Sequence, residues 1–258
     1  MDTRLHHRYG EKRFANAGAS QHSHEALPLW KRALDIACLI LAMPALVPIM
    51  ALIALGIRLS SRGPVLFRQE RIGLNARPFI CFKFRTMKAT AETRSHEAYL
   101  EKLMHSAVPM KKLDNSGDAR ILGIGVLLRA SGLDELPQVF NILRGEMSLV
   151  GPRPCIRYEY EKFKPEHRAR FNAVPGLTGL WQVNGKNHTT FQEMIDFDIQ
   201  YSRQLSFRND VAILLRTFPV LVGQVTEALQ HKRAQRHARG PVSQPRAAAN
   251  ATREMTTV

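Results

Sequence analysis

The chain has 258 residues, 45% of them apolar, which is enough for one sizeable core with a membrane segment beside it. Its 37 Lys and Arg residues outnumber its 22 Asp and Glu residues, so the net charge of +15 favours polyanionic partners: nucleic acid, anionic lipid or phosphorylated substrates. The three cysteines, Cys38, Cys81 and Cys155, lie far apart and form no C-x-x-C pair, so we expect reduced thiols facing a cytoplasm and no zinc site.

The N-terminal residues 1–27 are polar and lack periodicity, which predicts disorder. They do not resemble a secretory signal, because the apolar run starts only near residue 33 and no small-residue cleavage site follows it.

The next segment carries no charge from Ile36 to Ile57, a run of 22 residues. As a helix it would be about 33 Å long, enough for a bilayer core of roughly 30 Å. A buried helix of a soluble protein is the alternative, but an uncharged run of this length is typical of a membrane segment. Trp30, just before the run, suits an anchor at the membrane interface.

Two prolines, Pro44 and Pro48, interrupt this segment, and each removes a backbone hydrogen bond. Basic residues flank both ends, so the positive-inside rule does not distinguish the two sides. A straight span would leave one basic flank outside, whereas a broken, re-entrant helix keeps both in the cytoplasm. We therefore favour a re-entrant helix. The basic flanks are Lys31, Arg32, Arg58 and Arg62.

Further elements follow in chain order. Short apolar and aromatic runs around a Gly-Leu-Asn turn predict a β-hairpin over 65–87. Helices or apolar segments are expected at 91–113, 121–130, 132–144, 157–171 (interrupted at Pro165) and 190–205, with turns over 174–187. The apolar stretch 211–225 carries Arg216 and Pro219 and predicts an amphipathic interfacial helix or part of the core.

The stretch 129–154, RASGLDELPQVFNILRGEMSLVGPRP, carries the chemistry. It places two adjacent carboxylates, Asp134 and Glu135, shortly after Arg129. One interpretation is structural: Ser131 and Asp134 fit a capping box at a helix start. Against it, Pro137 is poorly placed inside such a helix. Spacing alone leaves the structural and the functional interpretation about equal.

The functional interpretation is a phosphoryl transfer. A carboxylate can attack phosphorus and form an acyl-phosphate. A neighbouring carboxylate can hold Mg²⁺ against a diphosphate, and arginines can clamp phosphate oxygens.

Several motifs resemble the bacterial sugar transferases, the monotopic polyprenyl-phosphate phosphoglycosyltransferases. They occur in collinear order over residues 31–220. The matching segments are KRALDIACLI (31–40), the proline-broken apolar helix, GPVLFRQERIGLNARPFICFKFRTM (63–87), LDELPQVFNILRGEMSLVGPRP (133–154), VPGLTGLWQVNGKN (174–187) and FDIQYSRQLSFRNDVAILLRT (197–217).

The resemblance implies an enzyme that passes galactose or glucose 1-phosphate from a UDP-sugar to undecaprenyl phosphate and releases UMP, which begins a polysaccharide repeat unit. It implies that Asp134 is the nucleophile, that Glu135 binds Mg²⁺ and that Arg129 contacts phosphate. The sequence does not identify the sugar.

Weaker assignments concern four further cations. The resemblance implies phosphate or nucleotide contacts for Arg153 of the GPRP motif, for Lys83 and Arg85 of the FKFRTM motif and for Lys186. Each also has an ordinary structural alternative, as a turn residue, a strand end or a solvated loop. Many relatives have Arg at the position of Lys186, which weakens a bidentate contact there.

Two residues of the last motif, Asp198 and Tyr201, are expected to be structural, and Trp181 is as compatible with the core as with the interface.

One departure concerns the membrane helix, where the family often has Ser-Pro and this chain has Met43-Pro44. Met cannot satisfy the freed backbone groups. The departure leaves open whether the helix spans or re-enters.

The expected fold class is α+β: a mostly helical monotopic membrane protein with a small β-hairpin and amphipathic interfacial helices. The predicted parts are a disordered tail over 1–27, the re-entrant helix over 28–62, a catalytic domain over 63–229 and a basic flexible tail over 230–258. We expect the inner membrane, with the site on the cytoplasmic face. A homo-oligomer stays open, because the same apolar surface could meet lipid or a second copy.

Two other functions compete with this one. A non-catalytic polybasic membrane adaptor explains the charge and the apolar segment but not the dyad. A nucleic-acid-binding protein is suggested by the charge, but no helix-turn-helix, zinc-finger or base-stacking pattern is present, so we expect no nucleic acid as partner.

Overall fold

The computed structural model describes residues 27–88, 100–104, 106, 108–110, 120–185 and 188–238. Almost all of the tail predicted over 1–27 lies outside these residues, as do 239–258. Of the helix predicted over 91–113, residues 100–104 are described as helical.

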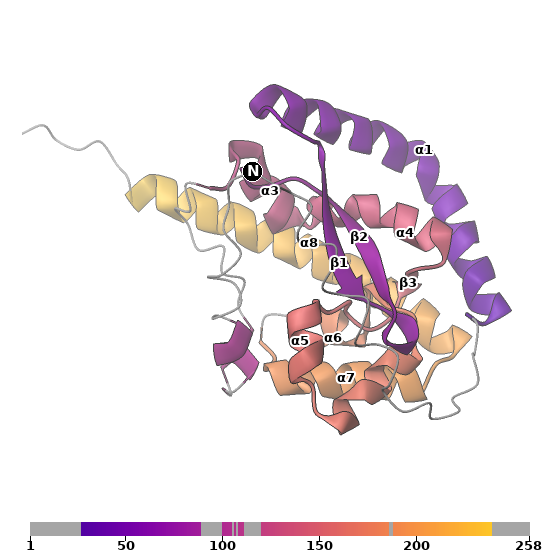
Figure 1. Ribbon diagram of the computed structural model, residues 1–258. Coiled ribbons are helices and arrows are strands. Elements are labelled where there is room, and N and C mark those ends of the chain that lie inside the picture. Colours follow the sequence, from indigo (N-terminus) through magenta and orange to yellow (C-terminus); the bar gives the residue numbers. More distant parts are fainter. Residues whose placement is uncertain are drawn as a thin grey trace, which may run out of the picture.

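The described residues are mostly helical and contain two small sheets, as the predicted fold class requires (Figure 1). Besides the helical residues 100–104, the helices are α1 (Leu29–Ser60), α3 (Gly123–Ser131), α4 (Val139–Arg144), α5 (Arg157–Lys162), α6 (Leu180–Val183), α7 (Phe191–Arg203) and α8 (Phe207–Ala238). Three 3-10 helices, η2 (Leu74–Ala76), η3 (Leu133–Gln138) and η4 (Pro165–Asn172), and four strands, β1 (Leu66–Ile72), β2 (Pro78–Phe84), β3 (Ser148–Val150) and β4 (Gly176–Thr178), complete the fold.

Helix α1 is the one helix among the described residues that is long and apolar enough to cross a membrane. Its 32 residues correspond to a length of about 48 Å. Pro44 and Pro48 lie inside it without ending it, and its ribbon bends in the middle (Figure 1). The prolines therefore redirect the helix but do not divide it into two.

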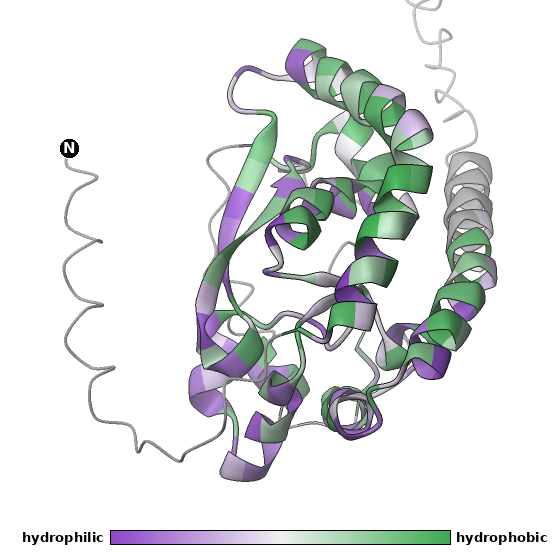
Figure 2. Cartoon of the chain, turned by 90° about the vertical axis from the view of Figure 1, so that its right-hand side faces the viewer, coloured by the Kyte–Doolittle hydropathy of each residue, from purple (hydrophilic) through white to green (hydrophobic). Residues whose placement is uncertain are grey.

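Both halves of α1 pack against the same body of the protein. In the first half, Leu39 joins an apolar cluster with Cys81 and Met147. In the second half, Ile53 and Ile57 pack with other residues of a further cluster. Other large apolar side chains of α1 are exposed, among them Leu41, Val47 and Leu52, and Figure 2 shows hydrophobic residues along much of α1.

The predicted hairpin is confirmed. Strands β1 and β2 are antiparallel and pair from Leu66 opposite Phe84 to Ile72 opposite Pro78. The turn between them contains Asn75 at φ 52°, a left-handed conformation that Asn tolerates better than most residues. In Figure 1 the hairpin runs between α1 and the helices α5 to α7.

Two segments differ from the expectation. The single helix predicted over 132–144 is a 3-10 helix, η3, followed by α4, because Pro137 has no backbone N–H for a continuous α-helix. The turn segment 174–187 contains β4, which pairs in parallel with β3. Three-residue strands carry too little periodicity to be detected from sequence.

The C-terminal helices agree better with the sequence. Helix α7 starts at a capping box in which Thr190 and Glu193 bond each other's backbone N–H groups. Helix α8 contains the predicted 211–225 stretch and continues to Ala238, past the start of the tail expected from residue 230.

A buried ion pair joins the start of α1 to α8. Lys31 Nζ lies 2.5 Å from Asp210 Oδ2, and both side chains are 1% exposed. The ammonium also donates to the hydroxyl of Tyr201 at 2.9 Å and to the carbonyl of Val150 at 2.7 Å. Nearby, Asp35 Oδ1 accepts from the backbone N–H of Leu149 at 2.9 Å. We call these six residues the helix anchor.

The helix anchor gives the first prediction. Lys31→Met leaves the Asp210 carboxylate buried without its cation, so the free energy of unfolding should fall by about 3–5 kcal/mol. Denaturant unfolding of the detergent-solubilised protein measures this. The control is Glu70→Gln, which breaks the exposed ion pair of Glu70 with Arg157 and should change stability by about 1 kcal/mol or less. Equal small effects of the two variants would contradict the assigned role of the anchor.

Candidate functional site

The predicted carboxylate dyad lies where α3 ends and η3 begins. Gly132 takes a left-handed φ of 74° and terminates α3. Asp134 and Glu135 then occupy the first turn of η3, both half-buried. Ser131 is the last residue of α3, and its hydroxyl donates to the carbonyl of Leu127 at 2.8 Å. The capping-box interpretation of Ser131 and Asp134 is therefore wrong, since η3 has no side-chain cap.

Strand β2 brings one predicted cation to the dyad. Lys83 Nζ lies 2.7 Å from Glu135 Oε1. Because side chains alternate along a strand, Lys83 shares its face with Cys81, which is buried in the core against α4. That face lies against η3, with which β2 has extensive contact. The hairpin thus directs Lys83 at the dyad.

Arg129 lies in the last turn of α3, directly before the dyad. Its Nη1 donates to Thr86 Oγ1 at 3.4 Å, a long hydrogen bond to a buried hydroxyl just after β2. Arg129 thus lies on the same short segment as the two carboxylates, and its contact with phosphate stays a prediction.

A buried amide holds the hairpin in place. Asn141 Oδ1 accepts from the backbone N–H of Phe82 at 3.1 Å, and its Nδ2 donates to the carbonyl of Ile80 at 2.6 Å. The Asn141 side chain thus supplies the donor and acceptor that a further strand would offer to this edge of β2. A second hydrogen bond from Nδ2, 2.7 Å to Glu146 Oε2, uses the other N–H donor of the amide. Asn141 fixes β2, and therefore Lys83, relative to α4.

Arg153 of the GPRP motif belongs to a buried cluster of charges. Its Nη1 donates to both carboxylate oxygens of Glu159, at 3.0 and 3.1 Å. Burial lowers the pKa of Arg153, but the Glu159 carboxylate outweighs this effect and the net pKa lies above the usual value. Burial likewise raises the pKa of Glu159, but the guanidinium groups of Arg153, Arg71 and Arg170 outweigh it, so the net pKa is lowered.

The remaining pair of this cluster is Arg170 with Asp198. The two side chains form an ion pair that is 1% exposed on both sides, and Arg170 also donates to the carbonyl of Arg153 at 2.7 Å. Burial raises the pKa of Asp198 to about 6, against the opposing effect of Arg170. The structural role expected for Asp198 is confirmed, as is that of Tyr201 in the helix anchor.

The sequence alone did not predict the buried charges Arg71, Glu159 and Arg170. Arg71 lies on β1 and donates to the carbonyl of Pro154 at 2.9 Å, which holds the GPRP turn against the hairpin. Its electrostatic neighbours include both Arg153 and Glu135. In the sequence Arg71 is one of three charged residues of β1, and this pattern does not distinguish a solvated charge from a buried one.

The structure does not place the two other predicted cations, Arg85 and Lys186, beside the dyad. The Arg85 guanidinium is buried and donates to the carbonyls of Arg62 and Ser61, at 2.8 and 2.9 Å. Phosphate binding by Arg85 would require breaking these hydrogen bonds. Lys186 lies outside the described residues.

The dyad suits one kind of metal site. The described residues contain no group of three His, Cys, Asp or Glu side chains that could hold a metal ion by themselves. A dyad of hard carboxylate oxygens fits Mg²⁺, which commonly takes one or two carboxylates and completes its coordination with substrate phosphates and water. The residues present therefore fit Mg²⁺ bound together with a phosphorylated substrate.

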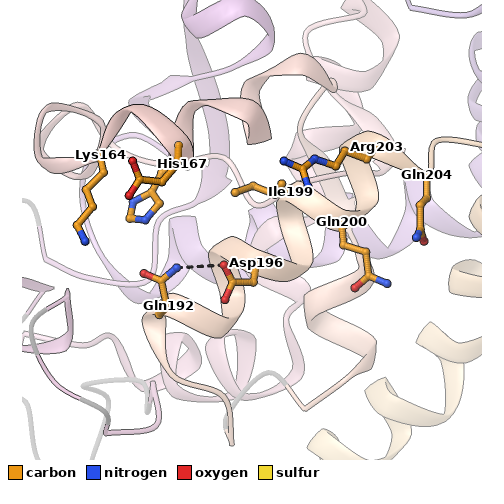
Figure 3. A pocket seen from close by; sticks show the side chains of 9 residues that line it. Lys164, His167, Gln192, Asp196, Ile199, Gln200, Arg203 and Gln204 are labelled. Atoms are coloured by element: carbon orange, nitrogen blue, oxygen red, sulfur yellow. Dashed lines mark hydrogen bonds between the residues drawn. The ribbon is translucent and has the colours of Figure 1, made fainter.

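A separate pocket of about 500 Å³ opens between η4 and α7 (Figure 3). It is lined by Lys164, Glu166, His167, Gln192, Asp196, Ile199, Gln200, Arg203 and Gln204. Figure 3 shows charges of both signs around it, with Gln192 bonded to Asp196. None of the predicted site residues lines this pocket, so the candidate site is the dyad with its cations.

Comparison with known proteins supports the predicted resemblance. Residues 26–224 match the family model described as bacterial sugar transferase. A galactosyl transferase, CpsE, of Streptococcus agalactiae is 41% identical over 161 residues, which are 62% of this chain and 35% of the relative. The exopolysaccharide production protein ExoY of Sinorhizobium fredii is 36% identical over 74% of this chain and 84% of the relative.

A third relative is the UDP-glucose:undecaprenyl-phosphate glucose-1-phosphate transferase of Caulobacter vibrioides. It is 40% identical over 205 residues, which are 76% of this chain and 71% of the relative. The chain thus spans about a third of the length of the Streptococcus protein and most of the length of the other two.

The Arg153 cluster gives the second prediction. Glu159→Gln keeps the shape of the side chain but leaves three guanidinium groups facing one carboxylate, so stability at pH 7 should fall by about 3–5 kcal/mol. Because the folded-state pKa of Glu159 is depressed, its contribution is present above the unfolded-state pKa of about 4.3 and is lost as the pH falls below it.

Unfolding of wild type and variant between pH 3 and pH 7 measures this effect, and the difference should narrow in acid. Glu161→Gln, an exposed residue of the same helix, is the control and should shift stability by about 0.5 kcal/mol at most. A pH-independent difference for Glu159→Gln would contradict the charge-based account.

Proposed function

This chain belongs to the bacterial sugar transferase family, and we propose that it transfers a hexose 1-phosphate, galactose or glucose, from a UDP-sugar to undecaprenyl phosphate. The product would begin a polysaccharide repeat unit. The observation that carries the proposal is the dyad of Asp134 and Glu135, held beside Lys83 and Arg129 on a protein with a long apolar helix.

The proposed reaction has two displacements at phosphorus. A carboxylate oxygen of Asp134 attacks the sugar-linked phosphorus of the UDP-sugar, the bond to the UMP oxygen breaks, and UMP leaves. The sugar phosphate is then held on Asp134 as an acyl-phosphate. An oxygen of undecaprenyl phosphate attacks the same phosphorus and releases the Asp134 carboxylate. The covalent intermediate divides one difficult displacement into two easier ones.

The neighbouring side chains handle charge. We assign Glu135 to Mg²⁺, which when bound would neutralise part of the diphosphate charge. Lys83 and Arg129 reach phosphate oxygens from β2 and from the end of α3. Arg153, which is hydrogen-bonded to Glu159, adds a positive charge from the GPRP turn. Arg71 adds a second positive charge, which interacts electrostatically with Glu135. The phosphate-binding assignments of Arg85 and Lys186 stay predictions.

The membrane arrangement follows from the packing of α1. Residues in both halves of α1 pack against the same folded domain. If α1 crossed the membrane as a straight helix, this domain would have to lie on both sides of a bilayer core of roughly 30 Å. We therefore propose a re-entrant α1 whose exposed apolar middle enters the membrane from the cytoplasmic face of the inner membrane. The site would then lie near the level of the lipid phosphate.

Other helices add apolar surface beside α1. Leu215, Phe218 and Leu221 of α8 are exposed, as are Val126 and Leu127 of α3. These side chains suit contact with the interfacial layer of a bilayer, which supports the proposed depth of the protein.

Replacement of the nucleophile tests the reaction. Asp134→Asn should lower UMP release by at least about a thousandfold, because a carboxamide cannot form the intermediate. Release is measured over a panel of UDP-sugars with Mg²⁺ and undecaprenyl phosphate. Asp196→Asn, the same change in the pocket between η4 and α7, is the control and should retain wild-type release. Failure of wild type to release UMP from any sugar would favour a non-catalytic membrane adaptor.

Accessibility labelling tests the re-entrant helix. Single cysteines are placed at Leu29 and at Leu59, which are exposed near the two ends of α1, in a variant whose own cysteines are replaced by alanine. A membrane-impermeant thiol reagent should label neither position in intact spheroplasts and both after permeabilisation. Labelling of one end in intact spheroplasts would show that α1 spans the membrane.

A further inference from the structure

The ion pair between Lys83 and Glu135 occupies the carboxylate that the proposed function assigns to Mg²⁺. The two side chains are 22% and 37% exposed, with 2.7 Å between Nζ and Oε1. A partly exposed pair of this kind adds little net stability, because solvent screens it and two long side chains lose freedom. Lys83 can therefore leave Glu135 for a stronger partner without disturbing the fold.

The backbone of Lys83 is fixed although its side chain can move. Lys83 is paired opposite Phe67 across the hairpin, and Asn141 bonds the neighbouring Phe82 N–H and Ile80 carbonyl. The four-carbon stem of a lysine carries an ammonium with three rotatable donors. A small rotation of that stem lets the ammonium exchange a carboxylate oxygen for a phosphate oxygen on the same side of β2.

We propose that Lys83 is a stand-in cation for the metal: it neutralises Glu135 while the site is empty and moves to the diphosphate when a nucleotide sugar enters. The inference rests on the proposed function. An ammonium and a dication repel each other at one carboxylate, so Lys83 disfavours metal binding at Glu135 until a diphosphate draws it away. Metal and nucleotide then bind together and not independently.

The composition of the site agrees with this coupling. The described residues supply no protein-only group of three metal ligands, so substrate phosphates would strengthen a Mg²⁺ site that otherwise relies on one or two carboxylates and water. The same phosphates also draw Lys83 away from Glu135, which makes metal binding depend more strongly on the nucleotide. Coupling of this kind is reciprocal, so the metal should tighten nucleotide binding by the factor by which nucleotide tightens metal binding.

The test measures Mn²⁺ binding by electron paramagnetic resonance, with Mn²⁺ in place of Mg²⁺ and the full chain in lipid nanodiscs. Without nucleotide, Lys83→Met should bind Mn²⁺ about two- to fivefold more tightly than wild type, because it loses the competing ammonium. UDP, which carries a diphosphate but no sugar, should raise the Mn²⁺ affinity of wild type more than that of Lys83→Met.

The matched control is Lys162→Met. Lys162 pairs with Glu101 at 3.0 Å, and both side chains are exposed, so this variant removes the same charge from a comparable ion pair. It should bind Mn²⁺ as wild type does. Lys83→Gln, a polar variant of similar length, replaces Lys83→Met if thermal unfolding shows that the latter is not folded.

Two results separate the possible failures. If Lys83→Met binds Mn²⁺ no more tightly than wild type without UDP, while Glu135→Gln weakens Mn²⁺ binding with UDP, the stand-in role is wrong and the metal assignment holds. If Glu135→Gln leaves Mn²⁺ affinity with UDP unchanged, the metal assignment in the proposed function is itself wrong, and the stand-in role falls with it.

Discussion

The buried ammonium of Lys31 determines how the membrane helix joins the rest of the protein. It bonds Asp210 on α8, Tyr201 on α7 and the carbonyl of Val150 on β3, three elements far from α1 in sequence. A buried charge is tolerated only while its partners stay in place. The start of α1 therefore cannot tilt or withdraw without leaving a carboxylate unpaired, and the apolar helix and the folded domain behave as one unit. In the proposed membrane arrangement, this constraint would set the depth at which the rest of the protein meets the lipid.

The dyad depends on neighbours more than on its own helix. Asp134 and Glu135 lie in a 3-10 turn, a conformation with poorer hydrogen-bond geometry than an α-helix. Its position is set by Gly132, which ends α3, and by β2, whose edge is held by Asn141. The apolar contact of Leu39 with Cys81 ties that hairpin to α1. The apolar helix and the candidate site are thus held by the same core.

The sequence predicted the long apolar helix and the hairpin, and it placed the two adjacent carboxylates that form the candidate site. The 22-residue apolar run, the hairpin and the Asp134–Glu135 dyad needed no tertiary information to recognise. The sequence could not show that Ser131 ends α3 and does not cap η3. The left-handed conformation of Gly132, which separates α3 from η3, depends on tertiary contacts. Nor could it show that Arg71 and Glu159 are buried partners, since the burial of a charged side chain depends on segments distant in the chain. Parallel strands of three residues carry too few side chains for any pattern.

The covalent role of Asp134 is the central claim, and peptide mapping after incubation with a radiolabelled UDP-hexose and Mg²⁺ tests it most directly. In the absence of undecaprenyl phosphate the intermediate should accumulate, so an acid quench and proteolysis should yield a peptide that carries hexose phosphate on Asp134. Addition of the lipid before the quench should remove the label. Absence of label from wild type, or the same label on the Asp134→Asn variant, would contradict the account.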